Sequence, residues 1–448
     1  MWKQTYIVGE NHDYPEFAKV QVVVVGGGAA GIAAAETAAR QGLDVLLIER
    51  YGFCGGAAVA GLSGTICGMY MSEENSKKPE QVVFGFTEKF RSALAAKGGI
   101  TPPQKYGNTW VVTHDPFTWK QTAENLLLEQ KVNILYHTQV IGVINEEDNI
   151  RGVIINTKSG LAAIHADVVI DASGDADVIY RAGYGYTMGK DGQIQNPTMI
   201  FKLSGVDVDR FTKFWGNDTI SSIEVTNMIN ESNDNGEFDL PRSKIWIFPT
   251  PNKNELLVNA TRVLGKDGRD LNVTDPIDHT EAEIMGRYQA KEYADFLKMR
   301  IKGCENSFLQ DTGVEVGVRQ TRSILGEERL TNEDVLSCRK RDDGIARSPW
   351  PIELHKGAKP KVEWLLNDYY EIPYKALLPI KGENLMVAGR CLSAEHEALA
   401  SARVTAQCFE YGHAAGLAAS QSIKENKTLR ELDGRQIREL LNEDGARL

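Results

Sequence analysis

A glycine-rich hexapeptide carries the clearest chemical signal in this sequence of 448 residues. Residues 26–31 read GGGAAG, so that Gly26, Gly28 and Gly31 fit the pattern G-x-G-x-x-G. In such a turn the first glycine permits a tight bend, the second lets the backbone approach a pyrophosphate, and the third lets the following helix pack closely on the strand. The N–H groups at the start of that helix then face the phosphates. We therefore expect a bound dinucleotide at this turn.

An acidic residue, Glu49, follows the turn by about twenty residues, which is the spacing that the dinucleotide fingerprint requires. Its carboxylate would accept hydrogen bonds from a ribose diol and would repel a 2′-phosphate, so the sequence disfavours NADP here. The alternative without a ligand is a glycine-rich turn followed by a solvated glutamate. The elements around the motif decide between the two interpretations.

These elements form a strand–helix–strand pattern. Residues 20–25 read VQVVVV, a β-branched run suited to a parallel strand that is buried on both faces. The small residues of 29–42 predict a helix that ends at a glycine, and LDVLLIE at 43–49 predicts the next strand. The crossover makes the two strands parallel neighbours, and in this context the glycine pattern becomes specific.

A second glycine pair, Gly55 and Gly56, distinguishes FAD from NAD. A loop without side chains just past the acidic strand end could run beside the pyrophosphate and the flavin end of an extended FAD, and NAD dehydrogenases rarely need such a loop. Cys54, directly before the pair, could also bond covalently to a flavin ring carbon, but a buried free thiol is the simpler interpretation. We therefore expect FAD that is bound non-covalently.

Three motifs resemble those of FAD-dependent oxidoreductases of the glutathione-reductase-like superfamily. ERYGFCGG at 49–56 matches E-R-x-G-x-x-G-G, and DASGD at 171–175 is similar to the A-T-G-D element that closes over the adenine side. MVAGR at 386–390, followed by SARV at 401–404, resembles the second FAD-binding strand, loop and helix. That helix would direct its positive N-terminus at the pyrimidine edge of the flavin, where charge builds on reduction.

The resemblance narrows to the FAD-dependent oxidoreductase family whose members carry R-x-x-R-x-I-x-G and A-G-R-C-x-S, here at 319–326 and 388–393. The chain has Arg390 where the wider superfamily usually has an aspartate. The resemblance covers nearly the whole chain and implies the cofactor, but not the substrate, because the family's substrates are diverse. The residues expected to bind FAD are Gly26, Gly28, Ala29, Ala30, Gly31, Glu49, Arg50, Cys54, Gly55, Gly56, Ala57, Val140, Ala172, Ser173, Gly174, Gly389, Arg390, Arg403 and Val404.

The order of the predicted elements gives an α/β fold. In the middle of the chain, alternating strands and polar loops separate two regions in which strands alternate with helices. We therefore expect a discontinuous Rossmann-type FAD-binding domain with an inserted, mainly β-sheet substrate domain. The expected divisions are 18–184 for the first part of the FAD-binding domain, 185–375 for the substrate or cap domain, 376–425 for the closing segment, and 426–448 for a C-terminal helical tail.

Candidates for catalysis are polar residues in apolar surroundings. Arg319 and Arg322 would share one face of a helix, where two guanidinium groups could bind a carboxylate or another anionic oxygen; the alternative is an internal ion pair. His355 lies in an apolar run and His396 in the loop before the last long helix, and either could move a proton, although a lone histidine is more often structural. Tyr370 could donate a proton or simply pack.

Charge and cysteine content exclude several other classes. The formal charge of −11 opposes broad attraction to nucleic acid or to an anionic membrane, and the sequence has no apolar run of membrane-spanning length. The first residues lack the basic flank and apolar core of a secretory signal, so we expect a cytoplasmic location. The six cysteines include no closely spaced pair, which argues against a metal centre or a redox dithiol.

The sequence therefore predicts an FAD-dependent dehydrogenase or oxidase that transfers hydride between a small polar substrate and flavin. A second G-x-G-x-x-G is absent, so electrons would come from the substrate and leave to oxygen or an external acceptor. One alternative is a reductase of an activated double bond at the same site. Another is a non-redox relative, such as a prenyl-protein escort or an RNA-modifying flavoprotein. The oligomeric state stays open, and a homo-oligomer is among the expected partners.

Overall fold

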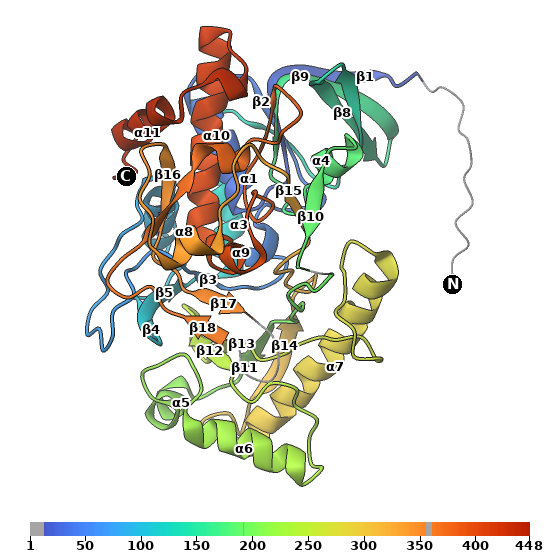
Figure 1. Cartoon of the computed structure of the whole chain (residues 1–448). Coiled ribbons are helices and arrows are strands. Elements are labelled where there is room, and N and C mark those ends of the chain that lie inside the picture. Colours follow the sequence, from blue (N-terminus) through green and yellow to red (C-terminus); the bar gives the residue numbers. More distant parts are fainter. Residues whose placement is uncertain (1–12, 191, 355–360) are drawn as a thin grey trace.

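The first elements of the chain form the predicted strand–helix–strand unit. A computed structural model describes residues 13–190, 192–354 and 361–448 (Figure 1). The strand β1 (Glu16–Val25) ends in valines that are at most 6% exposed, as a strand buried on both faces requires. The helix α1 (Ala29–Arg40) follows, and β2 (Val45–Ile48) returns parallel to β1 with Val22 opposite Val45.

A parallel sheet grows outward from this pair. β6 (Asn133–Leu135) lies beyond β2, and β9 (Gly160–Asp171) lies on the other side of β1, both in parallel register. The last residues of β9 pair in parallel with β20 (Leu385–Val387), which comes from much later in the chain. The first domain is therefore completed by the C-terminal part of the sequence, which makes it discontinuous as predicted.

An antiparallel meander extends the same sheet. β7 (Gln139–Glu146) and β8 (Asn149–Thr157) form an antiparallel hairpin, and β8 pairs with the first half of β9. One long strand thus serves both the meander and the parallel core. The carboxyl end of β9 lies at the same edge of the sheet as the ends of β1 and β2.

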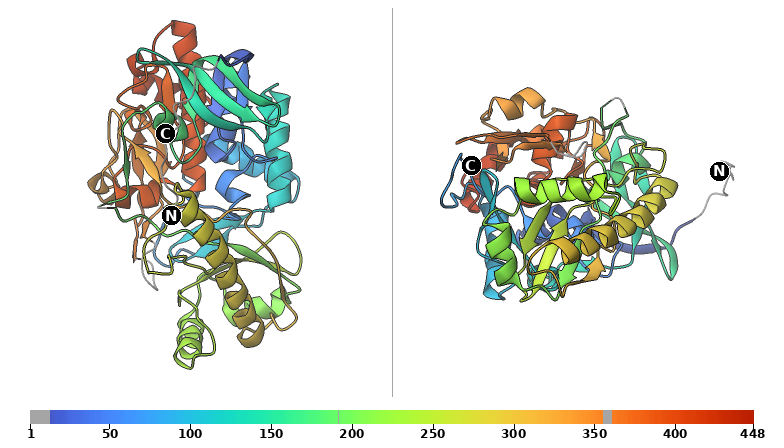
Figure 2. Two further views of the ribbon diagram at one scale, coloured as in Figure 1. Left: turned by 90° about the vertical axis from the view of Figure 1, so that its right-hand side faces the viewer. Right: turned by 90° about the horizontal axis from the view of Figure 1, so that it is seen from below.

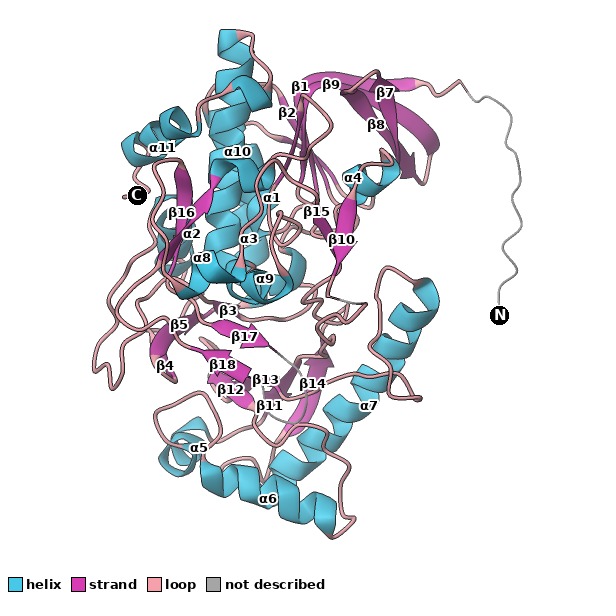
Figure 3. Cartoon of the chain, in the orientation of Figure 1, coloured by secondary structure: helices cyan, strands magenta, loops and turns pink. Residues whose placement is uncertain are grey.

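Helices of small residues cover one face of the parallel strands. α1 packs along α10 (Thr405–Glu425), and the two lie side by side in Figures 1 and 3. A Cβ at Gly412 would lie 2.0 Å from the carbonyl oxygen of Ala30, so the two backbones meet where no side chain separates them. α10 begins at Thr405, because Val404 has an extended backbone (ψ 163°) and separates α10 from α9 (His396–Ala402).

A second unit has its own antiparallel sheet and its own core. The sheet has the order β12 (Trp246–Pro249), β13 (Glu255–Asn259), β11 (Phe201–Ser204) and β14 (Phe308–Thr312). The helices α5 (Val208–Trp215), α6 (Ile223–Asp234) and α7 (Pro276–Arg300) pack against it. Figure 2 shows these green and yellow elements at the opposite end of the molecule from the red C-terminal helices. The predicted fold class, a Rossmann-type domain with an inserted sheet-based unit, is confirmed.

The two hydrophobic cores indicate where the inserted unit ends. The second core runs from Met199 to Val316, whereas Leu330, Ile345 and Tyr374 belong to the core around α1 and α10. The sequence pattern of strands and polar loops places residues 330–375 in the substrate domain, but apolar side chains of this segment pack with the first domain. We therefore propose a boundary near residue 316 instead of 375.

The other elements are short and connect or cover these two units. They are η1 (Gly56–Ala58), β3 (Thr65–Ile66), α2 (Gly85–Ala96), β4 (Gln104–Tyr106), β5 (Thr109–Thr113), α3 (Pro116–Glu129), α4 (Asp177–Arg181), β10 (Tyr186–Met188), β15 (Arg322–Ile324), α8 (Asn332–Leu336), β16 (Gly344–Ser348), β17 (Ile352–Leu354), β18 (Lys361–Glu363), β19 (Tyr370–Pro373), η2 (Tyr374–Leu377), η3 (Leu429–Glu431) and α11 (Gly434–Glu443).

A buried polar cluster attaches the C-terminal tail to α1 and α10. His413, 1% exposed, contacts Asp444 through Nε2 at 2.7 Å, and Arg40 donates from Nη1 to the same aspartate at 2.9 Å. Burial lowers the pKa of His413, but its contacts with Asp444 and Glu410 outweigh this effect and raise it to about 9. The same contacts hold the pKa of Asp444 below its usual value against the effect of burial. The tail helix is thus joined to the flavin-binding core by a charged histidine.

This cluster predicts how stability depends on pH. A raised folded-state pKa means that His413 contributes stability below its unfolded pKa of about 6.5, and that this contribution is lost as pH rises through about 9. We expect His413→Gln to lose about 2 kcal/mol of unfolding free energy at pH 6 and much less at pH 10, measured by chemical denaturation. His165→Gln, at a partly exposed position outside this cluster, serves as the control. Equal losses at both pH values would show that the charge of His413 does not stabilise the tail.

Candidate active site

The three glycines of the turn have separate structural roles. Gly26 has φ +100°, and a Cβ there would lie 2.5 Å from the carbonyl oxygen of Ala172. A Cβ at Gly31 would lie 1.8 Å from the carbonyl oxygen of Gly26, so the third glycine permits the close approach of helix and strand. At Gly28 the nearest described atom, Gly56 Cα, is 3.8 Å from a Cβ, and the residue lines a cavity. The space beside the second glycine is therefore open to a ligand.

The N-terminus of α1 is free to bind an anion. Among the described residues, no side chain caps the helix at Gly28, and its first turn has no acidic residue. Its first N–H groups lack partners within the helix, and they carry the positive end of the helix dipole. Ala29 and Ala30 line the cavity at this point. A pyrophosphate fits these donors.

Glu49 is held in place by backbone donors. The N–H of Gly27 donates to Oε2 at 2.7 Å, and the N–H of Tyr51 donates to Oε1 at 2.8 Å. Burial raises the pKa of Glu49, and these hydrogen bonds act in the opposite direction. Each carboxylate oxygen can accept a further hydrogen bond, and Glu49 lines the cavity, so the ribose role expected from the sequence fits its position.

The second glycine loop packs on the first. The N–H of Gly55 donates to the carbonyl oxygen of Gly27 at 2.7 Å, and a Cβ at Gly56 would lie 2.9 Å from Gly28 Cα. Cys54, which directly precedes Gly55 and was also expected to bind FAD, is fully buried and is not among the described residues that line the cavity. Burial raises the pKa of its thiol to about 12. Cys54 therefore supports the loop from behind, and its position does not favour a bond to the flavin ring.

Two ion pairs join segments from distant parts of the chain at the cavity wall. Arg50 pairs with Glu315, which also accepts a hydrogen bond from the Tyr51 hydroxyl. Arg390 donates from Nη2 to Asp175 at 2.6 Å, and both are largely buried. The arginine that replaces the usual aspartate of the superfamily thus has a carboxylate partner in the DASGD element.

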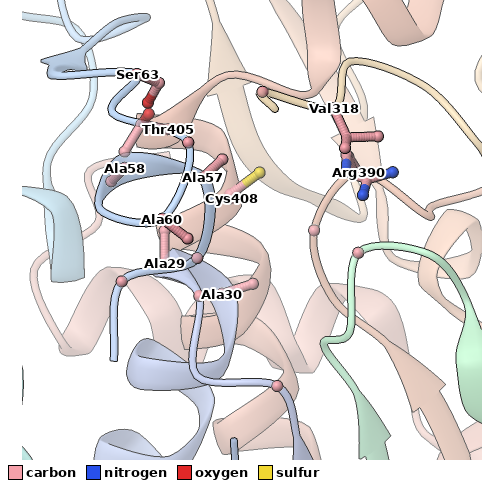
Figure 4. Close-up of a pocket in the computed structure, with 18 of the residues that line it drawn as sticks. Ala29, Ala30, Ala57, Ala58, Ala60, Ser63, Val318, Arg390, Thr405 and Cys408 are labelled. Carbon is pink, nitrogen blue, oxygen red and sulfur yellow. The ribbon is translucent and has the colours of Figure 1, made fainter. Parts of the chain in front are cut away.

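A cavity of about 480 Å³ runs between the two units, a size within the usual range of ligand sites. Figure 4 shows Ala29, Ala30, Ala57 and Thr405 gathered on one side of it, with Val318 and Arg390 across from them. The residues expected to bind FAD that line it are Gly26, Gly28, Ala29, Ala30, Glu49, Arg50, Gly55, Gly56, Ala57, Val140, Ala172, Ser173, Gly174, Gly389, Arg390, Arg403 and Val404. The two other expected residues, Gly31 and Cys54, are not among the described residues that line the cavity. Gly31 shapes the turn, and Cys54 packs behind the second glycine loop.

A second helix also begins at the cavity. α10 has Val404 as its N-cap, and no described side chain caps it. Val404 and Thr405 line the cavity, so the positive end of this helix faces the ligand space. A helix dipole in this position would stabilise negative charge on a reduced flavin.

The other end of the cavity is formed by residues that the sequence did not single out. The hydroxyl of Tyr106 donates to Glu353 Oε1 at 2.9 Å, and both residues are buried. Trp350, Ile200 and Phe248 supply apolar walls around this pair. A smaller cavity of about 420 Å³ lies on the other side and also touches Tyr106 and Glu353. The only sequence signal for these residues was the position of Glu353, an acid within the apolar run that precedes His355.

The structure places the two arginines that the sequence singled out in different surroundings. Residues 316–321 form no helix, and β15 begins at Arg322, so the two side chains do not share a helix face. Arg319 lines the cavity and donates from Nη1 to the carbonyl oxygen of Asn196 at 2.9 Å. Arg322 points elsewhere: it pairs with Asp177 at 3.1 Å and stacks on the Tyr180 ring at 4.2 Å.

The remaining catalytic candidates do not line this cavity in the described part of the chain. Tyr370 is fully buried, and its hydroxyl lies 2.8 Å from the Ser401 hydroxyl. It therefore packs within the first core. His396 opens α9 and is not among the described residues of the cavity wall. His355 lies outside the described residues.

This geometry defines an FAD-binding flavoprotein fold. The family model described as FAD dependent oxidoreductase matches residues 21–441, and the chain belongs to this family. It is an FAD-dependent oxidoreductase, and FAD is its cofactor. No curated protein shows a significant sequence match to the chain.

Several solved structures resemble this chain at low sequence identity. One is p-nitrophenol 4-monooxygenase PnpA from Pseudomonas putida DLL-E4, with 12% identity, 95% of this chain and 86% of that chain covered, and a TM-score of 0.50. Another is a geranylgeranyl bacteriochlorophyll reductase-like protein from Thermoplasma acidophilum, with 15% identity, 95% and 84% covered, and a TM-score of 0.49. The flavin-dependent brominase Bmp2 gives 15%, 95% and 83%, and 0.48.

The described residues offer neither a membrane-spanning helix nor a cluster of metal ligands. In the ranges 13–190, 192–354 and 361–448, none of the helices combines the length and the apolar character needed to cross a membrane. Within the same ranges, His, Cys, Asp and Glu side chains form no group of three that could hold a metal ion.

The open space beside Gly28 generates a direct test of the cofactor site. In Gly28→Val the new side chain would enter the cavity where the backbone meets the pyrophosphate, and its Cβ itself has room. We expect FAD affinity to fall by about tenfold to a hundredfold with the fold retained, because overpacking costs about 1–3 kcal/mol. Flavin fluorescence titration of apoprotein measures the affinity, and Ala95→Val on the exposed side of α2 is the control. Normal binding in Gly28→Val would mean that the turn does not bind the phosphates.

Proposed function

We propose that the enzyme is of the dehydrogenase or oxidase type and transfers hydride between FAD and a small polar organic substrate. Bound FAD supplies the hydride chemistry, so the protein has to place a substrate carbon and move a proton. The observation that carries the proposal is the buried Tyr106–Glu353 pair within apolar walls, in the same cavity as the flavin-binding turn. A polar substrate would be bound here by a few side chains and enclosed by Trp350 and Phe248.

The Tyr106–Glu353 pair is suited to move a proton. Burial and the neighbouring carboxylate raise the pKa of Tyr106 well above its usual value, so the hydroxyl keeps its proton and donates to Glu353. A carboxylate that accepts from a phenol can take a proton from a substrate hydroxyl or amine directly or through that phenol. This pair takes the role that the sequence assigned to His355 or His396.

Arg319 is suited to orient the substrate. It reaches the cavity from the loop between the two units, and its visible hydrogen bond is to a neutral carbonyl group. A guanidinium group with remaining donors binds an oxygen of the substrate in a fixed geometry. Electrons leave the flavin to oxygen or to an external acceptor, since the sequence contains one dinucleotide motif.

An anaerobic reduction experiment tests the proposal. The FAD-loaded enzyme is mixed without oxygen with a panel of small hydroxy acids, amino acids and alcohols, and the visible flavin absorbance is followed. We expect at least one class of compound to bleach the flavin. If no compound reduces the oxidised enzyme, while an activated alkene reoxidises the reduced enzyme, the reductase alternative replaces this proposal.

Variants of the proton-moving pair sharpen the test. Tyr106→Phe and Glu353→Gln should retain the flavin spectrum but lower the rate constant of flavin reduction by about 10²–10⁴, the usual contribution of a general acid or base. The profile of that rate constant against pH should lose one limb. The control is Tyr288→Phe, since Tyr288 is 67% exposed on α7. Wild-type reduction rates in both variants would remove the pair from the mechanism.

A further inference from the structure

The charged groups of the cavity fall into two sets. In the first set each charge has a partner: Arg50 pairs with Glu315, Arg390 pairs with Asp175, and Glu49 accepts from backbone N–H groups. In the second set, Arg319 and Arg403 line the cavity near the Tyr106–Glu353 pair, and Arg242 lies close to Arg319 without being among the described residues of the cavity wall. We name these three residues, Arg242, Arg319 and Arg403, the guanidinium cluster.

The members of the guanidinium cluster are held by neutral groups. Arg319, 7% exposed, donates to the Asn196 carbonyl oxygen, and Arg403 donates from Nη2 to the side-chain oxygen of Gln195 at 3.0 Å. Arg242, 2% exposed, lies over the Trp246 ring at 4.5 Å. Of the residues that the structure describes, none places a carboxylate oxygen within 4.0 Å of these three guanidinium groups.

Some donors of the guanidinium cluster lack protein acceptors. Nη2 of Arg242 and Nε of Arg403 are buried and have no hydrogen-bond partner in the described part of the chain. Burial and the charges of Arg242 and Arg403 hold the pKa of Arg319 well below its usual value. Glu353 is the nearby acid that acts against this effect. One acid for three buried cations leaves an excess of positive charge, which is unfavourable unless an anion is bound.

The phosphates of FAD do not explain this excess. They belong at the N-terminus of α1 and at the loop of Gly28 and Gly56, in the first unit. Arg242 precedes β12 in the inserted unit, and Arg319 follows the end of the second core. Two members of the guanidinium cluster, Arg319 and Arg403, line the cavity close to Tyr106 and Glu353, at the end that remains for a substrate.

We propose that the guanidinium cluster binds a carboxylate of the substrate, so that this oxidoreductase acts on small organic acids. This inference rests on the proposed function and names its substrate class. A planar carboxylate matches the fork of a guanidinium group with two parallel hydrogen bonds, and the apolar side chains of Trp350 and Phe248 line the same cavity. The carbon skeleton beyond it would then lie next to the Tyr106 hydroxyl, where the proton is moved.

Ligand binding to the oxidised holoenzyme tests this inference without turnover. The FAD-loaded protein is titrated with acetate, malonate and succinate, and separately with malonamide and succinamide, while the visible flavin spectrum and the heat of binding are recorded. We expect at least one carboxylate to bind and to perturb the flavin spectrum, and the neutral amides to bind at least about tenfold more weakly.

Two variants localise the binding. Arg319→Gln and Arg403→Gln should weaken carboxylate binding by about tenfold to a hundredfold, the loss expected for a charged hydrogen bond. Arg210→Gln, an exposed arginine of α5 that pairs with Glu305, should bind as the wild type does. Arg319→Lys and Arg403→Lys keep the charge without the fork, and they provide the same measurement if the glutamine variants fail to fold.

The outcomes separate this inference from the proposed function. A yellow, FAD-loaded enzyme that binds no carboxylate, or binds amides and carboxylates equally well, overturns the substrate class and leaves the flavin chemistry in place. Tighter binding of inorganic phosphate than of every carboxylate overturns it too, as do unchanged affinities in both the lysine and the glutamine variants. A colourless protein that does not take up FAD contradicts the proposed function itself.

Discussion

The flavin-binding half of the molecule depends on close contact between backbones that carry no side chains. A Cβ at Gly31 would lie 1.8 Å from one carbonyl oxygen of the turn, and a Cβ at Gly412 would lie 2.0 Å from the Ala30 carbonyl oxygen. These contacts bring α1 and α10 against each other and against one face of the parallel sheet. Both helices therefore begin at the cavity, and their first N–H groups give it a positive lining. A larger residue at either glycine would move whole elements.

Contacts between remote segments then complete the cavity. β20 joins β9 in the parallel sheet and delivers Gly389 and Arg390 beside the DASGD element. The Arg50–Glu315 pair links the end of β2 to the chain that leaves the inserted unit. Because Arg390 and Asp175 are largely buried, removing one partner would leave the other charge desolvated, which costs far more than the loss of a surface ion pair. The Arg390–Asp175 pair thus joins the two parts of the FAD-binding domain, and the Arg50–Glu315 pair links the inserted unit to that domain.

Local sequence patterns predicted the cofactor half well. The glycine turn, Glu49 and the second glycine loop depend on residues close together in the chain, so a sequence motif contains most of the geometry. The same reasoning failed at Arg322, where a spacing of three suggested a helix but the chain enters a strand. Tyr106 and Glu353 could not be found in this way, because long-range packing brings them together from β4 and β17. The domain boundary expected at residue 375 was inferred from the local pattern of strands and polar loops. The packing of Ile345 and Tyr374 in the first core depends instead on long-range contacts, which a local pattern does not contain.

The distribution of charge explains how an acidic protein can accept anions. The whole chain carries a formal charge of −11, which repels anions at long range. The described walls of the cavity carry five acidic residues and five arginines, but two helix N-termini add partial positive charge. Near Glu353 two arginines, Arg319 and Arg403, meet this one acid in a space with apolar walls. Electrostatic interactions are stronger in such a low-dielectric space than at the solvated surface. Selectivity for an anionic ligand therefore arises from the local arrangement of a few buried groups, and overall charge is a poor guide to what this site binds.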